Sequence, residues 1–168
     1  MKVIFLDIDG VLNSEKTCKE WHDKTGKGGY GGWLDEEDVC TDENIKWGID
    51  LFSNLKKIVD ETGAVIVISS TWRRHFSIKK FKEMFSVYGW DNAPIIEKTC
   101  YVVHGNRGSE VQSWMQGKDI TSYVILDDST DFLEEQFDYF VNTDFMVGLS
   151  EKDADLAINI LNNKNKQS

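Results

Sequence analysis

The sequence predicts a three-layer α/β fold, in which a parallel sheet of about five strands carries helices on both faces. Short runs of apolar, often β-branched residues, typical of strands buried on both faces, alternate with longer segments whose apolar residues recur at helical spacing. This alternation implies parallel strands joined by right-handed crossovers. With 168 residues, 40% of them hydrophobic, we expect a single domain over 1–168 with a core that needs no disulfides.

The first predicted strand, residues 2–6, ends in an acidic turn. Lys2 and four apolar residues are followed by Asp7, Ile8, Asp9 and Gly10. At a strand end the chain leaves the ladder, so both acids can converge above the edge of the sheet. In open α/β sheets, ligands bind outside the carboxyl ends of the strands, so these residues form a candidate ligand site. An ordinary acidic strand-to-turn connection is the alternative.

A long polar, glycine-rich segment without periodicity follows, at about 13–43, and predicts a loop. We interpret it as a flap, or minimal cap, over the end of the first strand. Its apolar side chains would close on a ligand: Trp21, Tyr30, Trp33 and Leu34. The alternative is an exposed excursion of the surface without a role in binding.

The next elements are a helix, a strand and a helix. Apolar residues at helical spacing predict a helix from 41 or 42 to 62, with Gly63 as its stop. Residues 64–68 form a buried strand that ends in the polar segment 69–74. Ser77 then caps a helix that runs to residue 88. This order places hydroxyls and guanidinium groups beside the acids of the first strand.

The middle of the chain carries weaker patterns. Residues 95–96, after the single proline, predict a short edge strand, and 101–103 predict another extended piece. The sequence Ser-Glu-Val-Gln at 109–112 predicts a capping box that opens a short helix, with Arg107 just upstream. Its Trp114, like Trp72, is interpreted as a core aromatic.

The last third of the chain returns to strong alternation. Residues 123–126 predict a buried strand that ends in Asp127 and Asp128. A short helix at 132–137 and a strand at 139–141 follow. A final helix begins after the cap Ser150 and runs to residue 161, before a polar tail.

Polar side chains therefore follow several strand ends that share one edge of the predicted sheet. Adjacent carboxylates repel one another unless a divalent ion neutralises them. Since no His or Cys accompanies these acids, the set suits a hard, oxygen-bound ion such as Mg²⁺. Magnesium beside a hydroxyl and a cationic side chain is typical of phosphate chemistry. The residues concerned are Asp7, Asp9, Ser69, Arg107, Asp127 and Asp128.

Taken together and in this order, these residues resemble the haloacid dehalogenase (HAD) superfamily of aspartate-dependent phosphatases. More narrowly, residues 68–73 (Ile-Ser-Ser-Thr-Trp-Arg) and 107–114 (Arg-Gly-Ser-Glu-Val-Gln-Ser-Trp) resemble the branch found in RNA-repair multidomain proteins. The resemblance covers most of the chain but not residues 13–43. It implies a Rossmann-like, HAD-like fold and a Mg²⁺-dependent phosphomonoester hydrolase.

The resemblance also implies roles for the acids. Asp7 would be the nucleophile that forms an aspartyl phosphate. Asp9 would protonate the leaving oxygen and later deprotonate the attacking water. Mg²⁺ would bind Asp7, the backbone carbonyl of Asp9, and Asp127, with Asp128 as a direct or a water-mediated ligand.

The remaining implied roles concern the phosphate. Ser69 would donate to a phosphoryl oxygen together with backbone N–H groups near Asp9 and Gly10. Arg107 would neutralise the phosphoryl group, and Lys118 is the alternative for this role. Further expected substrate contacts are Ser70 and Arg73, with Arg74 and the aromatic residues of the flap available to hold a base and ribose.

Charge and cysteine content limit the partners and the compartment. The net charge of −10 disfavours non-specific binding to nucleic acid and favours a small nucleotide or another metabolite, whereas the resemblance implies a nucleotide or a nucleic-acid-end phosphate as substrate. A small-metabolite (sugar) phosphatase and a phosphoacceptor or phospho-ligand binding module without turnover are the alternatives. Three cysteines without a close pair and no apolar stretch of membrane length predict a soluble cytoplasmic protein. We also expect a monomer, since no obligate protein partner is evident in the sequence.

Overall fold

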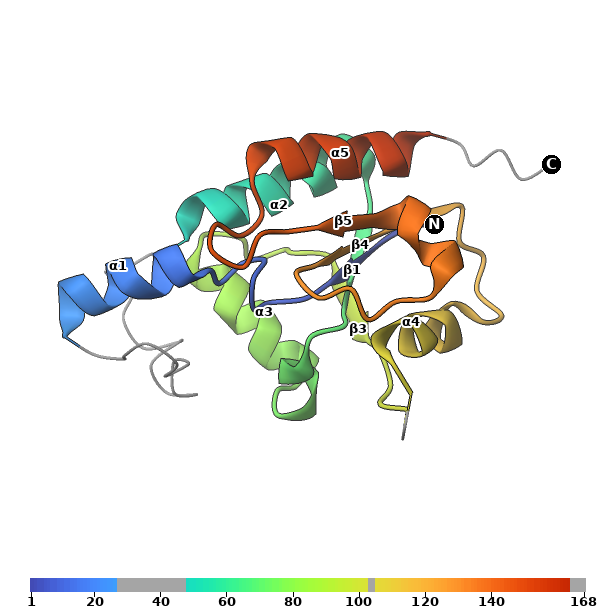
Figure 1. The fold of residues 1–168 in the computed structure, drawn as a ribbon, viewed down its shortest axis with the longest axis horizontal. Coiled ribbons are helices and arrows are strands. Elements are labelled where there is room, and N and C mark those ends of the chain that lie inside the picture. Colours follow the sequence, from blue (N-terminus) through green and yellow to red (C-terminus); the bar gives the residue numbers. More distant parts are fainter. Residues whose placement is uncertain (27–47, 103–104, 164–168) are drawn as a thin grey trace.

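The computed structural model describes residues 1–26, 48–102 and 105–163, and within them a five-stranded parallel sheet of the order β3-β2-β1-β4-β5 (Figure 1). The predicted α/β, Rossmann-like fold is confirmed. Its strands are β1 (Lys2–Leu6), β2 (Val65–Ile68), β3 (Ile95–Lys98), β4 (Ser122–Asp127) and β5 (Phe140–Asn142).

Strand β1 is the central strand of the sheet. It pairs with β2 on one side and with β4 on the other, so that Leu6 is opposite both Ile68 and Leu126. Alternate β1 side chains enter the two cores: Ile4 and Leu6 face one, Val3 and Phe5 the other. This explains the uninterrupted apolar run, since a strand with both faces covered has no solvent-facing position. The ends of β1, β2 and β4 are thereby neighbours at one edge.

Helices cover both faces of the sheet. The larger core packs α2 (Ile49–Thr62), α3 (Ile78–Val87) and α5 (Glu151–Asn162) against one face, and α2 and α5 lie side by side (Figure 1). The opposite face carries α4 (Arg107–Met115) through Val111 and Trp114. Trp114 is thus a core aromatic, as predicted.

The predicted loop at 13–43 is wrong in its first part. Residues Glu15–Thr25 form a helix, α1, whose N-cap Ser14 makes a capping box with Thr17. Its sequence lacks an apolar stripe, so the helix is invisible to periodicity, and the cap is the signal that could have found it. The remainder of the predicted flap, with Tyr30, Trp33 and Leu34, lies outside the described residues, as does the side chain of Trp21.

One helix start differs from the prediction, and another lies outside the described residues. The described helix α2 begins at Ile49, after Gly48 in the left-handed region at a φ of 64°, and its predicted start at residue 41 or 42 lies outside the described residues. Helix α4 begins at Arg107 with Asn106 as its N-cap, since the Asn106 side chain accepts from the N–H of Ser109 at 2.8 Å. The predicted capping box at 109–112 is therefore wrong, and Arg107 belongs to the first turn.

Most of the other elements agree with the prediction apart from their ends. The edge strand at 95–96 and the Ser77 and Ser150 caps are confirmed. Residues 101 and 102 form no strand, and 103 lies outside the described residues. The polar segment after β2 contains a 3-10 helix, η1 (Thr71–Arg74), and the short helix predicted at 132–137 is a 3-10 helix, η2 (Glu134–Tyr139).

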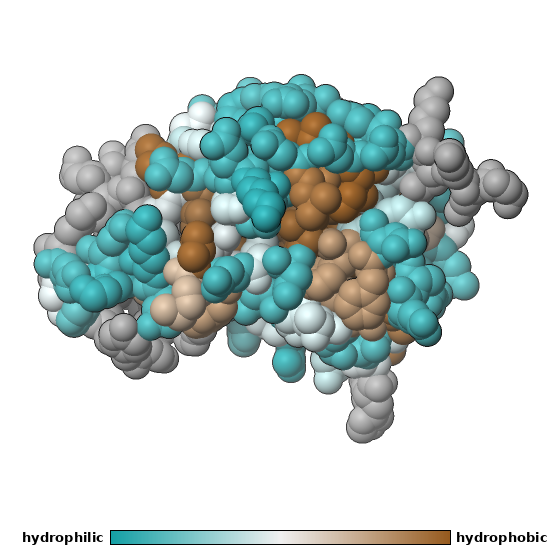
Figure 2. Space-filling view, turned by 45° about the horizontal axis from the view of Figure 1, so that its top comes forward, coloured by the Kyte–Doolittle hydropathy of each residue, from teal (hydrophilic) through white to brown (hydrophobic). Residues whose placement is uncertain are grey.

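No helix within the described ranges is long and apolar enough to cross a membrane. Figure 2 shows a face that is largely hydrophilic around its outline, with hydrophobic residues gathered towards its centre. Several large apolar side chains remain exposed, among them Phe145, Met146 and Val147 in the loop between β5 and α5.

Candidate active site

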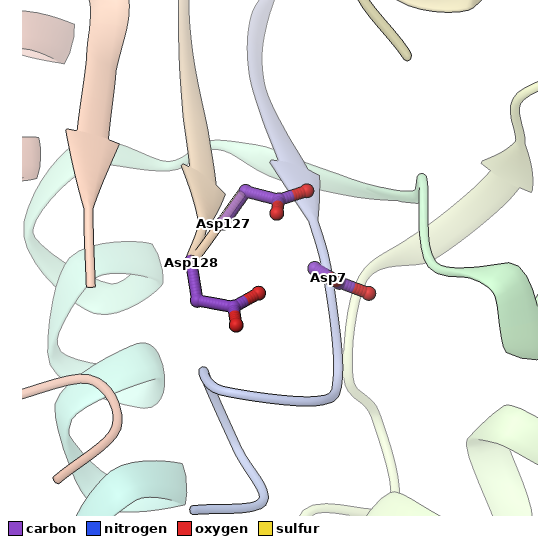
Figure 3. A group of neighbouring side chains, drawn as sticks. All are labelled: Asp7, Asp127 and Asp128. Carbon is purple, nitrogen blue, oxygen red and sulfur yellow. The ribbon is translucent and has the colours of Figure 1, made fainter. Parts of the chain in front are cut away.

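Three carboxylates meet where β1 and β4 end (Figure 3). Asp7 directly follows β1, Asp127 is the last residue of β4, and Asp128 follows it. One oxygen from each lies within 4.8 Å of the other two. Because β1 and β4 are paired in parallel, their ends deliver these acids to one point, as the sequence predicts.

Arg107 is the cation of this cluster. Its Nη1 atom lies 2.7 Å from Asp7 Oδ2 and 2.5 Å from Asp127 Oδ2, so one guanidinium nitrogen bridges the two strand ends. Burial opposes the charge on Arg107, but the attraction of Asp7 and Asp127 outweighs it, so its pKa is raised. Arg107 reaches this point because the first turn of α4 lies at the carboxyl edge of the sheet.

Lys118 does not reach the carboxylate cluster. Its ammonium donates to the carbonyl of Trp114 at 2.9 Å and pairs with Glu97 at 3.8 Å. It follows the C-terminal end of α4, whereas Arg107 opens that helix. Of the two candidates that the sequence offered, Arg107 therefore has the geometry for the cationic role.

Gly10 gives Asp128 the room that it needs. The backbone of Gly10 has a φ of 70°, and a Cβ atom there would lie 2.4 Å from Asp128 Cγ. Its N–H donates to the carbonyl of Asn13 at 2.7 Å, and its carbonyl accepts from Thr143 Oγ1 at 2.8 Å. A side chain at this position would displace Asp128, so the glycine is required by close approach as well as by conformation.

Asp9 lies apart from the three-carboxylate cluster and has its own partners. Trp72 Nε1 donates to its Oδ2 at 2.9 Å, and Asn13 Nδ2 donates to its Oδ1 at 3.2 Å. Burial, with a smaller contribution from the charge of Asp7, raises the pKa of Asp9 to about 6, although both hydrogen bonds oppose the shift. A carboxyl group with such a pKa exchanges protons readily near neutral pH.

The sequence alone did not identify Trp72 and Asn13 as site residues. Trp72 packs against the larger core, as predicted, but its indole N–H also binds Asp9. Its place directly after a strand that ends at the same edge is the signal that could have found it. The sequence predicts Asn13 as the first residue of a loop, but Asn13 is 1% exposed and closes the turn that begins at Asp9.

Ser69 offers a free hydroxyl at the same edge. It follows β2, its N–H donates to the carbonyl of Leu6, and its side chain is 1% exposed. Its Oγ has no hydrogen-bond partner within the part of the chain that the structure describes. A buried hydroxyl without a partner is costly, so a ligand oxygen at this edge is a natural acceptor for it.

Arg73 and Ser70 are used inside the protein, which differs from the substrate contacts expected from the sequence. The Arg73 side chain is 6% exposed, pairs with Glu110, and donates to the carbonyls of Ser69 and Ser70 at 2.6 and 2.7 Å. The buried Ser70 hydroxyl accepts from the N–H of Trp72. Both residues fix the course of the chain after β2.

Replacing Glu110 by Gln should therefore destabilise the fold. The variant leaves the Arg73 guanidinium buried without a counter-charge, so we expect the free energy of unfolding to fall by about 3–5 kcal/mol in urea titrations. The double variant Arg73→Met/Glu110→Leu should recover much of this loss, because it removes both charges. Glu83→Gln, which breaks an exposed pair with Lys79, is the control and should leave stability unchanged. A loss under about 1 kcal/mol for Glu110→Gln would contradict a structural role for the pair.

The donor set of the cluster fits a divalent cation. Burial, followed by the charge of Asp7, raises the pKa of Asp127 to about 7 and raises that of Asp128 as well. One arginine cannot neutralise Asp7, Asp127 and Asp128 together. Closely spaced carboxylate oxygens without imidazole or thiolate suit a hard ion such as Mg²⁺.

Stability should accordingly fall as pH rises when no divalent ion is present. The folded-state pKa values of Asp9 and Asp127 are about 6 and about 7, above the ordinary value of 3.8. Between pH 3.8 and these raised pKa values, the folded protein therefore binds more protons than the unfolded chain. We expect the Tm in EDTA to decrease from pH 4 to pH 8, and Mg²⁺ to raise it most at pH 8. Asp127→Asn should flatten both dependences. A Tm that Mg²⁺ leaves unchanged at pH 8 would argue against a metal at this cluster.

The fold is a Rossmann-like parallel α/β sheet. The ends of its central strands carry acidic residues around one arginine, which is an arrangement that can bind a charged ligand. Residues 3–154 match the family described as the HAD domain in Swiss Army Knife RNA repair proteins. The chain belongs to this family, within the HAD superfamily, and the resemblance inferred from its motifs is confirmed. Membership indicates phosphatase-type chemistry. Neither a curated protein nor a solved structure matches the chain.

Proposed function

We propose that this protein is a Mg²⁺-dependent phosphomonoester hydrolase that works through an aspartyl phosphate on Asp7. The observation that carries the proposal is the position of Arg107, whose Nη1 contacts both Asp7 and Asp127 while Asp9 stays outside this contact. A nucleophile, a phosphate-neutralising cation and a separate proton carrier are thus available at one edge.

The proposed reaction has two steps. A carboxylate oxygen of Asp7 attacks phosphorus while the bond to the leaving oxygen breaks, and Asp9 gives that oxygen its proton. Asp9 then takes a proton from water as the water oxygen attacks the aspartyl phosphate, and the bond between phosphorus and Asp7 breaks to return the free carboxylate.

Asp7, Asp127, Asp128 and the backbone carbonyl of Asp9 would hold the magnesium ion. When bound, the ion supplies positive charge to neutralise the carboxylates and the phosphoryl oxygens. Ser69 would use its unpartnered hydroxyl to bind a phosphoryl oxygen, and Arg107 would exchange part of its contact with Asp7 for the phosphoryl group.

We propose a nucleotide or a nucleic-acid-end phosphate as substrate. The description of the family names RNA repair proteins, whose substrates are nucleic acids. The exposed Tyr101, at the edge of the sheet that carries the acids, also supports the proposal. The guanidinium of Arg74, after β2, lies 5.0 Å from the ring centre of Tyr101, after β3, and Tyr101 is 59% exposed. An exposed ring beside a cation can stack on a base. The net charge of −10 favours a strand end or a short nucleotide over a long duplex.

Replacing Tyr101 by Ala should lower kcat/KM for a 3′-phosphorylated oligonucleotide by about 5- to 100-fold, the effect of losing one stacked base. Turnover of an aryl phosphate, which lacks a base, should not change. Phe137→Ala serves as the control. It removes an exposed aromatic that packs on Phe140 at the start of β5, the outer strand on the other side of the sheet from β3. Equal losses on both substrates would contradict a base-stacking role.

The proposed function is tested by a panel of substrates assayed with Mg²⁺ and with EDTA. The panel contains 3′-phosphorylated oligonucleotides, nucleoside monophosphates, sugar phosphates and an aryl phosphate. We expect Mg²⁺-dependent release of phosphate, highest for the first two classes. Highest activity on sugar phosphates would replace our substrate with a small metabolite, and no release from any substrate would contradict the proposal.

A phosphoacceptor module that is phosphorylated on Asp7 without turnover is the second candidate, since an aspartate at a strand end also describes receiver domains. An acceptor needs no acid two residues after the phosphorylated aspartate. The carboxyl group of Asp9, which Trp72 and Asn13 hold by hydrogen bonds, therefore favours the hydrolase. A single-domain, monomeric organisation and a cytoplasmic location remain predictions from the sequence.

A further inference from the structure

The carboxyl group of Asp9 is held at both of its oxygens by two different parts of the chain. Trp72, in η1 after β2, donates its indole N–H to Oδ2 at 2.9 Å. Asn13, which closes the turn after β1, donates its side-chain N–H to Oδ1 at 3.2 Å. We propose that Trp72 and Asn13 are positioning residues that fix Asp9 in the orientation for proton transfer. This inference rests on the proposed function.

A third residue sets the orientation of the Asn13 amide. Cys18, on α1, donates its thiol to Asn13 Oδ1 at 3.0 Å, so the amide nitrogen must face Asp9. Burial, followed by the charges of Asp9 and Glu15, raises the pKa of the Cys18 thiol and keeps it a donor. The contact therefore runs from α1 through Asn13 to the proposed proton carrier.

The backbone holds Asn13 as firmly as its side chain does. Its N–H donates to the carbonyl of Ile8 at 3.0 Å, and its carbonyl accepts from Gly10 at 2.7 Å. The residue is 1% exposed, so water does not compete for its amide. Asn13 is thus a fixed donor whose position is set by the turn that carries Asp9 itself.

Trp72 is held equally firmly from the other side. Its backbone N–H donates to Ser70 Oγ, and its ring packs against Phe76 with 5.6 Å between ring centres. Together with Asn13 it lines a small apolar pocket of about 20 Å³ that also touches Met84 and Tyr88. Packing on these neighbours fixes where the indole N–H points before any substrate binds.

Each oxygen of Asp9 keeps lone-pair capacity beyond these contacts, so the two donors leave room for the transferred proton. Loss of one donor lets the carboxyl group rotate away from the leaving oxygen. The consequence should depend on the substrate, because a leaving group that departs as a stable anion needs no proton, whereas a basic one does.

The test compares Trp72→Phe with the wild type on aryl phosphates that range from dinitrophenyl to phenyl phosphate. We expect a loss of kcat/KM, which reports the first step alone, of about 10-fold or more on phenyl phosphate and under about 3-fold on dinitrophenyl phosphate. Trp114→Phe is the matched control, since Trp114 Nε1 is buried without a hydrogen-bond partner among the described residues. It should show no dependence on the leaving group. Asn13→Ala should repeat the pattern of Trp72→Phe, and Asp9→Asn should show it most steeply.

Several outcomes separate this inference from the proposed function. A wild type that hydrolyses none of these phosphates overturns both. A second outcome overturns the positioning role alone. In it, the wild type is active and the loss in Asp9→Asn depends steeply on the leaving group, but Trp72→Phe and Asn13→Ala lose equally on every leaving group. If Trp72→Phe fails to fold by circular dichroism, Asn13→Ala decides. The Trp72 indole N–H signal in NMR, which should move in Asp9→Asn and stay in Asp60→Asn, reports the contact without any assay of activity.

Discussion

Replacing Asp7 by Asn should lower Mg²⁺-dependent phosphate release by at least about 10³-fold, because a carboxamide cannot form the acyl phosphate that the mechanism requires. The fold should tolerate the change, since Asn keeps the volume of Asp and its oxygen can still accept from the N–H of Ile8 at 2.8 Å. Arg107 retains Asp127 as a partner. Turnover is measured on an aryl phosphate with and without Mg²⁺.

The matched control for this variant is Asp60→Asn on α2, which makes the same chemical change at an exposed ion pair with Lys56. Its turnover should equal that of the wild type. Mass spectrometry after acid quench should find a phosphorylated Asp7 in the wild type and none in Asp7→Asn. Undiminished turnover in Asp7→Asn would remove Asp7 from the mechanism.

Asp9→Asn should reduce turnover by about 10²- to 10⁴-fold for a poor leaving group, since the amide has no proton to give the leaving oxygen and cannot activate water. With dinitrophenyl phosphate the first step needs no acid, so phosphorylation of Asp7 should continue. The second step still lacks its base. We therefore expect a burst of dinitrophenol followed by a long-lived aspartyl phosphate, detected by rapid quench and mass spectrometry.

The same variant separates the hydrolase from the phosphoacceptor module. In an acceptor, the phosphorylation and the slow loss of phosphate should be the same in Asp9→Asn as in the wild type. In a hydrolase, the aspartyl phosphate of the variant reaches a higher level and lasts longer than that of the wild type. Asp138→Asn, an exposed change on η2, is the control and should match the wild type in both measurements.

The described site also explains why the acids are tolerated so near the core. Asp7 and Asp127 are 2% and 0% exposed, and an isolated buried carboxylate would be strongly destabilising. Arg107 offsets part of the repulsion, and Gly10 lets Asp128 approach the turn. The remaining negative charge would be offset by the divalent cation that we propose for this site.

The sequence by itself determined the sheet and the identity of its edge. Buried parallel strands are continuous apolar runs, so 2–6, 64–68 and 123–126 could be found directly, and the parallel topology then brings Asp7, Ser69 and Asp127 to one side. Periodicity predicted the helices that pack on the sheet. It could not predict α1, because that helix depends on its cap and carries no apolar stripe.

Only the tertiary structure decided which polar side chains face the site. The sequence predicts both Arg73 and Arg107 as contacts of the substrate. In the structure, Arg73 is buried against Glu110, whereas Arg107 bridges Asp7 and Asp127. Trp72 likewise is an aromatic residue that the sequence predicts for the core, yet its indole N–H also donates to Asp9. The physical reason is that spacing along a strand or helix fixes the edge on which a residue lies, whereas the partner of a long polar side chain depends on elements far away in the chain.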